Sequence, residues 1–245
     1  MQLYGLIGFP LGHSFSKGYF TAKFEKEHIE NSTYENFPLP DINGFPELVH
    51  SLPNLKGLNV TIPHKTAVIP FLDELDPAAK AIGAVNTIRN EGGRLTGYNT
   101  DTIGFRESLE VLLQPHHKHA LVLGTGGASK AVVYTLRQLG ITYRLVSRHP
   151  QGPDDLRYEQ IDAAILEKYT LLINTTPLGM HPATDTAPPL PYEYLDARHF
   201  LYDLVYNPGK TLFLHKGEAQ GAAIKNGHEM LVLQAEAAWK IWNKA

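Results

Sequence analysis

The sequence contains no cysteine, no long apolar run and no block of charge of one sign. The lack of cysteine excludes disulfides, thiolate metal sites and a cysteine nucleophile. No apolar run approaches the roughly 20 residues of a membrane-spanning helix. The 22 basic and 25 acidic residues are mixed along the chain, which disfavours nucleic acid and anionic membranes as partners. We therefore expect a cytoplasmic protein that acts on a small molecule.

The 12 histidines do not follow a metal-binding spacing. His116, His117 and His119 lie in a polar stretch, and no His-Glu-x-x-His motif occurs. We predict that the histidines are surface residues and that the chain has no metal site.

Apolar runs of strand length alternate with segments of helix length, which is typical of parallel sheets with crossover helices. The strands are expected at residues 3–8, 58–62, 120–124, 143–147, 171–175 and 200–205. Between Val85 and Tyr98 two short strands flank a glycine pair, which predicts a hairpin. The length of 245 residues fits two modest domains.

The run Leu121 to Ser129 predicts a buried strand that turns through glycines into a helix. Gly124 would allow the tight turn, and Gly126 would let the backbone approach a pyrophosphate. Gly127 and Ala128 open the helix, whose amino terminus would stabilise the negative charge. A tight turn without a ligand is the alternative, but the strand and helix context favours a dinucleotide site.

The next predicted strand ends in Ser147 and Arg148. An NAD site needs a carboxylate at this point to accept a hydrogen bond from the ribose 2'-hydroxyl, whereas a guanidinium can bind a 2'-phosphate. The sequence therefore favours NADP(H), unless Arg148 is only a solvated loop residue.

A second group of polar residues follows another strand. Asn59 and Thr61 are expected on one face of this strand, and the apolar residues, Ile62 among them, on the other. Pro63 ends the strand, so that Lys65 opens a helix beside the polar groups. This arrangement would hold a polyhydroxylated ligand beside a proton donor. An edge strand with a wet face and a solvated lysine is the alternative.

Other polar residues stand at positions that suggest a ligand. Asn86 lies near the start of the hairpin, and Asp101 lies near the amino terminus of the next helix, where an N-cap role is the alternative. Gln234 interrupts an apolar helical stripe and needs a partner, either the backbone or a ligand hydroxyl. Ser16 fits an N-cap, which leaves Ser14 unexplained.

Together these segments resemble the shikimate dehydrogenase family over nearly the whole chain. The matching motifs are His13-Ser14-x-Ser16, Asn59-Val60-Thr61-x-Pro63-x-Lys65, Gly83-Ala84-Val85-Asn86-Thr87, Asn99-Thr100-Asp101, the Gly124 turn, Asn174-Thr175-Thr176-Pro177, Tyr202-Asp203-Leu204-Val205-Tyr206 and Met230-Leu231-Val232-x-Gln234. The resemblance implies reversible reduction of 3-dehydroshikimate to shikimate with NADPH. The sequence departs from the family where Ser147-Arg148-His149 replaces the common Asn-Arg-Thr, and at Asn226 and Glu229.

The resemblance also implies an α/β fold with two domains. Residues 1–100 with 228–245 would form the substrate-binding and catalytic domain, and residues 101–227 a Rossmann-like NADP-binding domain. Lys65 and Asp101 would form the catalytic pair. The other implied site residues would bind the substrate (Ser14, Ser16, Asn59, Thr61, Asn86 and Gln234) or the cofactor (Gly124, Gly126, Gly127, Ala128, Ser147, Arg148, Thr175 and Gly227). A monomer or a homodimer is expected.

Two other functions remain open. An NAD-using quinate or shikimate dehydrogenase is disfavoured because neither Ser147 nor Arg148 is acidic. A non-catalytic sensor of small molecules on the same fold would most simply have lost Lys65 or Asp101, and the chain retains both.

Overall fold

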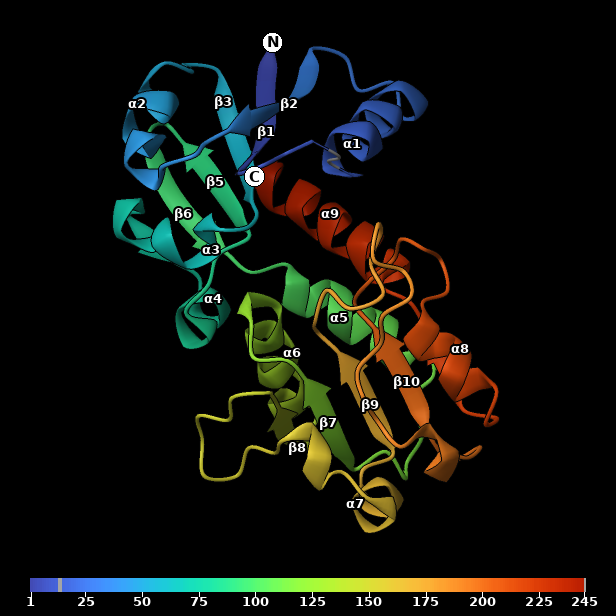
Figure 1. Ribbon diagram of the computed structural model, residues 1–245. Coiled ribbons are helices and arrows are strands. Elements are labelled where there is room, and N and C mark those ends of the chain that lie inside the picture. The colour runs from blue at the N-terminus through green and yellow to red at the C-terminus, as the bar shows by residue number, and fades with distance from the viewer. Residues whose placement is uncertain (13–14, 245) are drawn as a thin grey trace. The chain divides into compact units, whose positions relative to one another are not determined.

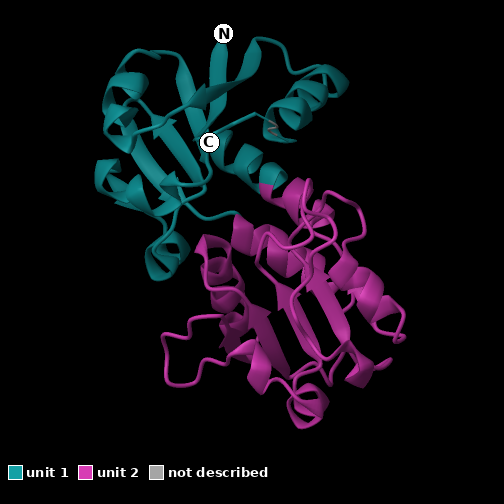
Figure 2. Cartoon of the chain, viewed as in Figure 1, with its two compact units in different colours: residues 1–100, 235–245 teal, residues 101–234 magenta. Residues whose placement is uncertain are grey.

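The computed structural model describes residues 1–12 and 15–244, so the predicted ligand residue Ser14 lies outside the described residues. The chain forms two compact units, residues 1–100 with 235–245 and residues 101–234 (Figure 2). The helix α9 (His228–Trp242) contributes to both units. The sequence-based boundary at residue 228 falls at the start of this helix, and the division between the units falls after Gln234.

The first unit is built on a six-stranded mixed sheet in the order β2-β1-β3-β5-β6-β4 (Figure 1). Its strands are β1 (Gln2–Gly8), β2 (Ser32–Pro38), β3 (Leu55–Val60), β4 (Glu74–Leu75), β5 (Thr87–Glu91) and β6 (Arg94–Tyr98). Its other helical segments are α1 (Phe15–Lys26), η1 (Ile42–Gly44), α2 (Phe45–His50), α3 (His64–Ala67), η2 (Ile69–Phe71) and α4 (Pro77–Ile82). The strands β2, β1 and β3 are parallel, and β3, β5 and β6 are antiparallel.

The second unit is built on a five-stranded sheet in the order β11-β10-β9-β7-β8, in which every strand pair is parallel. Its strands are β7 (His119–Leu123), β8 (Thr142–Val146), β9 (Leu171–Asn174), β10 (Phe200–Asp203) and β11 (Ala223–Lys225). Its other helical segments are α5 (Asp101–Glu110), α6 (Gly127–Gln138), η3 (Tyr158–Gln160), α7 (Ala163–Lys168), η4 (Tyr192–Tyr194) and α8 (Leu212–Glu218). The winding reverses between β7 and β9, where ligands bind in open α/β sheets.

Both faces of the five-stranded sheet are buried. Leu121 and Leu123 of β7 pack in one cluster with Phe213 of α8, and Val122 packs in another with Phe105 of α5. Neighbouring strand residues therefore enter opposite cores, which explains why the strand sequences are almost continuously apolar. Polar side chains are left to the strand ends.

The first unit closes on the last turns of α9. The Trp242 ring packs with Tyr4 and Phe20, and its Nε1 donates to the carbonyl of Ile88 at 2.9 Å. Gly57 of β3 lies directly beneath the indole, because a Cβ atom at this position would approach the ring to 2.2 Å. The missing side chain of Gly57 is thus what lets α9 pack on the sheet.

A buried charge also ties α1 to α9. Lys23 is only 8% exposed, and its Nζ donates to Glu27 at 2.7 Å and to Glu236 at 2.9 Å. Tyr19 donates a second hydrogen bond to Glu236. Removing one partner of such a pair leaves a poorly solvated charge, so this cluster fixes the position of α1.

The strands expected from the sequence are confirmed as β1, β3, β7, β8, β9 and β10, and the hairpin as β5 and β6. The hairpin turns through Gly92 and Gly93, whose φ angles of 62° and 96° suit glycine. The strand β2 was missed, because Tyr34 is its one fully buried residue and polar residues separate it from Phe37.

Two expectations around β3 are wrong. Ile62 was expected on the apolar face but is 74% exposed, because the strand already ends at Val60. The helix expected to continue to Leu72 ends at Ala67, and the 3₁₀ turn η2 follows it, since Pro70 cannot supply a helical N–H donor.

The histidines are not all at the surface. His64, His117 and His199 are buried, and each has a backbone hydrogen bond: His64 Nε2 to Leu39 O at 2.6 Å, His117 Nδ1 from the Gln114 N–H at 2.9 Å and His199 Nε2 to Leu166 O at 3.0 Å. Burial and the neighbouring His116 lower the pKa of His117, and the hydrogen bond between its Nε2 and the Arg198 carbonyl opposes this effect. The three imidazole rings therefore hold backbone segments in place through hydrogen bonds.

Within residues 1–12 and 15–244, no helix is both long and apolar enough to cross a membrane. The same residues contain no group of three or more histidine, aspartate or glutamate side chains that could hold a metal ion.

The contact between Gly57 and Trp242 predicts the effect of adding one methyl group. Gly57→Ala should destabilise the protein by about 1–3 kcal/mol, because either the sheet or the indole must shift. Gly18→Ala in α1 is the matched control, since a Cβ atom there meets nothing within 4 Å. The control should raise stability by about 0.5–1 kcal/mol through helix propensity. Urea unfolding measures both, and equal effects would contradict the packing argument.

Candidate functional site

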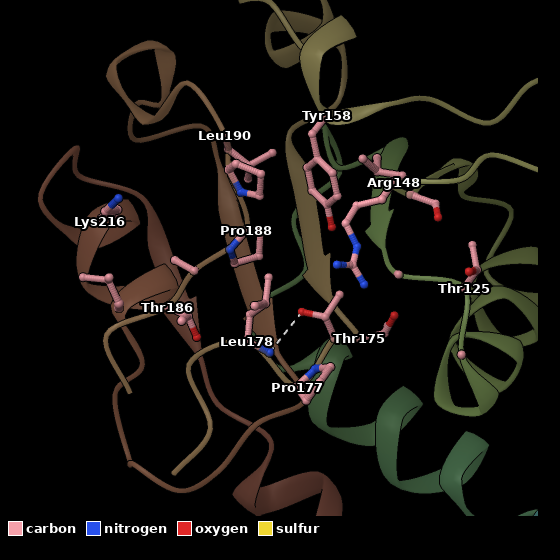
Figure 3. Close-up of a pocket in the computed structure, with 18 of the residues that line it drawn as sticks. Thr125, Arg148, Tyr158, Thr175, Pro177, Leu178, Thr186, Pro188, Leu190 and Lys216 are labelled. Atoms are coloured by element: carbon pink, nitrogen blue, oxygen red, sulfur yellow. Dashed lines mark hydrogen bonds between the residues drawn. The ribbon is translucent and has the colours of Figure 1, made fainter. Parts of the chain in front are cut away.

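A cavity of about 770 Å³ opens at the carboxyl ends of β7, β8 and β9 in the second unit (Figure 3). This is the point at which the strand order reverses. Five of the predicted cofactor residues line the cavity: Gly124, Gly126, Ser147, Arg148 and Thr175. Its volume is in the range of sites that bind organic cofactors.

The turn from β7 into α6 is built on glycine. Gly124 has a φ of 109°, and a Cβ atom there would lie 2.8 Å from Thr175 Oγ1. Gly126 is the N-cap of α6, and a Cβ atom there would meet nothing within 4 Å, so the backbone faces open space. Gly127 and Ala128 form the first turn of α6. The N–H groups of that turn and the helix dipole can bind a phosphate.

The end of β8 presents a cation and a hydroxyl to the cavity. Arg148 is exposed at the cavity wall, and Ser147 precedes it. The Ser147 hydroxyl accepts a hydrogen bond from the His149 N–H at 3.1 Å, which shapes the loop. The charged side chains on the cavity wall are Arg148, Lys216 and Asp185. The position at the strand end that would need a carboxylate for NAD carries none.

For two further predicted cofactor residues, contacts within the protein explain why threonine or glycine stands at that position. Thr175 follows β9, and both its N–H and its Oγ1 donate to the Leu123 carbonyl, at 2.9 and 2.8 Å. Gly227 precedes α9, and a Cβ atom there would come within 2.1 Å of Leu204 O. Only glycine fits at residue 227, whether or not a cofactor passes there.

In the first unit, the predicted substrate residue Asn59 is buried in a polar cluster. Its Oδ1 accepts from Tyr34 Oη at 2.7 Å, and its Nδ2 donates to Asn86 O and Thr87 Oγ1, both at 3.3 Å. Tyr34 also hydrogen-bonds Ser16. Burial raises the pKa of Tyr34, and the Ser16 bond opposes that rise. Ser16 and Asn59 are therefore brought together through one phenol.

Asn86 joins the same cluster and fixes the chain before Asp101. Its Oδ1 accepts from the Thr100 N–H at 2.7 Å, and its Nδ2 donates to Thr100 Oγ1 at 3.0 Å. Asp101 follows immediately as the first residue of α5, where the helix dipole stabilises a carboxylate. Sequence analysis did not find this network, because its bonds join residues far apart in the chain.

Thr61 and Lys65 follow the end of β3. The Thr61 N–H donates to Ile7 O at 2.9 Å, and the carbonyl of Lys65 accepts from the Val85 N–H at 2.7 Å. These bonds fix the backbone of both residues, and the Lys65 side chain is half-buried. Lys65 belongs to the first unit and Asp101 to the second. Their catalytic pairing stays a prediction.

Gln234 has a backbone partner. It is 8% exposed, and its Nε2 donates to the carbonyl of Leu231 at 2.9 Å within α9. Gly104 of α5 packs against its backbone, since a Cβ atom there would lie 3.0 Å from the Gln234 nitrogen. The side-chain amide of Gln234 thus has a backbone partner, as one of the two expectations held. A contact between Gln234 and a ligand stays a prediction.

Comparison with known proteins identifies the family. The model of the shikimate dehydrogenase substrate binding domain matches residues 6–88. A shikimate dehydrogenase (NADP(+)) of Desulforamulus reducens is 38% identical over 98% of this chain and 89% of its own length. The chain belongs to the shikimate dehydrogenase family.

Solved structures of shikimate dehydrogenases have the same fold. The enzyme of Aquifex aeolicus superposes with a TM-score of 0.88 at 34% identity, covering 100% of this chain and 93% of that one. The shikimate 5-dehydrogenase of Thermus thermophilus, in complex with NADP(H) and shikimate, gives a TM-score of 0.87 at 33% identity, covering 100% and 94%. These structures confirm the expected α/β fold of the shikimate dehydrogenases.

Sequence analysis included Asp203 in a motif of the shikimate dehydrogenase family but gave this carboxylate no role. Asp203, at the end of β10, is 0% exposed. Its Oδ1 accepts from Asn174 Nδ2 and from the Val205 N–H, both at 3.0 Å, and its Oδ2 accepts from Thr211 Oγ1 at 2.5 Å. Asn174 in turn accepts from the Thr176 hydroxyl at 2.6 Å. Through these hydrogen bonds Asp203 fixes the segment after β9, which forms part of the cavity wall.

Burial raises the pKa of Asp203 to about 6, although its hydrogen bonds oppose this. Between about pH 4, where the carboxyl of the unfolded chain ionises, and pH 6, the folded protein binds more protons. Stability from this group thus falls as pH rises through that interval.

Asp203→Asn should remove this pH dependence, because the amide keeps one acceptor and does not ionise. The unfolding free energy of the variant relative to wild type should rise between about pH 4 and 6, by on the order of 2 kcal/mol in total. Urea unfolding across that interval measures it. Parallel pH profiles of the two proteins would show that the Asp203 carboxyl is not perturbed.

Proposed function

We propose that this protein catalyses the reversible, NADPH-dependent reduction of 3-dehydroshikimate to shikimate. The observation that carries the proposal is the relation, over 98% of the chain, to a protein named shikimate dehydrogenase (NADP(+)). The cavity at the switch point of the second sheet supports it, because a glycine turn, a helix amino terminus and Arg148 meet there. These are the groups that a pyrophosphate and a 2'-phosphate need.

NADP(H) fits this cavity better than NAD. The strand β8 ends in Ser147 and Arg148, so the position that meets the adenosine ribose carries a guanidinium. A guanidinium attracts a 2'-phosphate and can bind it through two hydrogen bonds. We assign the pyrophosphate to the first turn of α6, at Gly126, Gly127 and Ala128.

The substrate would be held by the polar residues at the end of β3 and by residues further along the chain. We assign contacts with the carboxylate and hydroxyl groups of shikimate to Ser14, Ser16, Asn59, Thr61, Asn86 and Gln234. Among these, the amide of Asn59 is already bonded to Tyr34 and Thr87, so it also orients the cluster.

Reduced nicotinamide, when bound, supplies the hydride. Lys65 stabilises the negative charge that forms on the ketone oxygen and donates a proton to that oxygen. Asp101 accepts a hydrogen bond from a substrate hydroxyl and orients the lysine. Thr100, bonded to Asn86 at 2.7 and 3.0 Å, fixes the backbone next to Asp101.

We also expect the protein to act in the cytoplasm as a monomer or a homodimer. The absence of cysteine from the chain agrees with a reducing compartment. Sedimentation velocity of the purified protein decides between the two assemblies.

The experiment that tests the function monitors nicotinamide absorbance with shikimate and either NADP or NAD. Reduction of NADP at a rate far above that of NAD is the expected result. Quinate in place of shikimate tests the substrate. No turnover with shikimate and either cofactor, in protein shown to be folded by circular dichroism, would overturn the proposal.

Lys65→Met tests the proton donor. The change removes the ammonium but keeps a side chain of similar length, so turnover should fall on the order of 100-fold or more while the Michaelis constant for shikimate changes little. Steady-state kinetics measures both constants. Lys56→Met, an exposed lysine in β3, is the matched control and should behave as wild type. Near-normal turnover of Lys65→Met would exclude Lys65 as the donor.

Arg148→Ala tests the choice of cofactor. Loss of a charge-assisted contact should raise the Michaelis constant for NADP on the order of tenfold or more, with little change for NAD. Arg137→Ala serves as control, because this arginine lies at the end of α6 and bonds Tyr143. An equal effect of Arg148→Ala on both cofactors would contradict the assignment.

A further inference from the structure

The chain that continues from Arg148 returns to the edge of its own sheet. Leu156 forms a parallel bridge with Val146. Its N–H donates to Leu145 O at 2.8 Å, and its carbonyl accepts from the Ser147 N–H at 2.9 Å. Arg157 Nη1 adds a bond to the Arg148 carbonyl at 3.2 Å. The segment that leads into η3 is therefore fixed against the end of β8.

This return brings a tyrosine to the cavity. Tyr158 is 8% exposed and lines the cavity together with Arg148. Figure 3 shows its ring reaching into the cavity with the hydroxyl end toward the guanidinium of Arg148, and with Leu190 and Pro188 on the other side of the ring. The positive charge of Arg148 acts to lower the pKa of Tyr158, against the larger effect of burial.

Among residues 1–12 and 15–244 the Tyr158 hydroxyl makes no hydrogen bond, and it is not one of the buried side-chain oxygens without a partner, so the oxygen is open to the cavity. Tyr192, which lines the same cavity, differs in this respect, because its hydroxyl donates to Pro188 O at 2.8 Å. Tyr158 is buried as a residue while its hydroxyl opens into the cavity, so this hydroxyl can donate to a bound ligand instead of a protein group.

Two observations define that group. In a sheet of this topology the pyrophosphate lies at the helix after the first strand, and the end of the second strand meets the adenosine ribose. Arg148 at the end of β8 favours an anion there. Burial raises the pKa of Tyr158 above its ordinary value, although Arg148 opposes the rise, so the phenol stays protonated and can donate.

We infer that Tyr158 donates a hydrogen bond from its hydroxyl to the 2'-phosphate of NADP(H) and, with Arg148, determines the preference for NADP over NAD. This inference rests on the proposed use of NADP(H). Arg148 supplies the charge, and Tyr158 supplies a neutral donor fixed by the bridge between Leu156 and Val146. A neutral donor strengthens phosphate binding without adding a second exposed cation.

Tyr158→Phe removes the hydroxyl alone. Calorimetric titration with adenosine 2',5'-bisphosphate should give a dissociation constant about tenfold weaker than wild type, because a bond to a charged group is lost. Adenosine 5'-monophosphate, which lacks the 2'-phosphate, should bind with a constant changed by less than about twofold. In kinetics, the Michaelis constant for NADPH should rise while that for NADH and the turnover number stay the same.

Tyr192→Phe is the matched control, since it makes the same change in the same cavity at a hydroxyl that is already bonded. With this variant, the dissociation constants of both nucleotides should rise by the same small factor. Thermal denaturation checks folding, and Tyr158→Leu offers a second side chain without a hydroxyl if the phenylalanine variant does not fold.

Equal weakening of both nucleotides by Tyr158→Phe would overturn the inference and indicate contact with adenine. Unchanged binding of the bisphosphate would also overturn it. These titrations use no shikimate, so they stand apart from the assay of the proposed function. A protein that selects the bisphosphate but does not oxidise shikimate would contradict the function and leave the role of Tyr158 intact.

Discussion

A parallel sheet covered on both faces leaves only its strand ends for polar side chains. In the second unit Leu121, Leu123 and Val122 enter opposite cores, so reactive and ligand-binding groups are confined to the residues just after each strand. Gly124 and Thr175 stand at those points. The cavity therefore results from the burial of the sheet, because the carboxyl ends of parallel strands share one edge.

The polar groups at that edge are ordered by bonds from neighbouring strand ends. Asp203 reaches Asn174 on one side and Thr211 on the other. In the first unit the amide of Asn59 and the phenol of Tyr34 play the same part. In each cluster the polar atoms lose contact with water, and their mutual hydrogen bonds hold them in a fixed geometry.

Much of this arrangement was predictable from the sequence, because the information is local. Apolar runs identified the strands of the second unit, and the glycines after β7 predicted the turn with a positive φ at Gly124. The position of Arg148 beside the cavity was predictable because this residue stands at a strand end. The motifs of the family then ordered these parts into two domains.

The features that sequence analysis missed depend on contacts between distant segments. The strand β2 is mostly polar, and Tyr34 is its one fully buried residue. The pKa of Asp203 is raised because helices and loops from other parts of the chain exclude water around it. The position of Tyr158 depends on the bridge from Leu156 to Val146, which no local sequence pattern predicts. The buried His117 likewise contacts the carbonyl of Arg198, which lies far from it in the chain.

The bridge at Leu156 has a further consequence, for the behaviour of many copies in solution. An outer strand with open N–H and C=O groups can recruit the same strand of a second molecule and start a growing ribbon. Here Leu156 occupies backbone groups of β8, and Pro153 with Asp154 lies along the same edge. At the other edge β11 has only 3 residues. The edges of the second sheet are thus either occupied or short, which disfavours strand pairing between copies at this sheet.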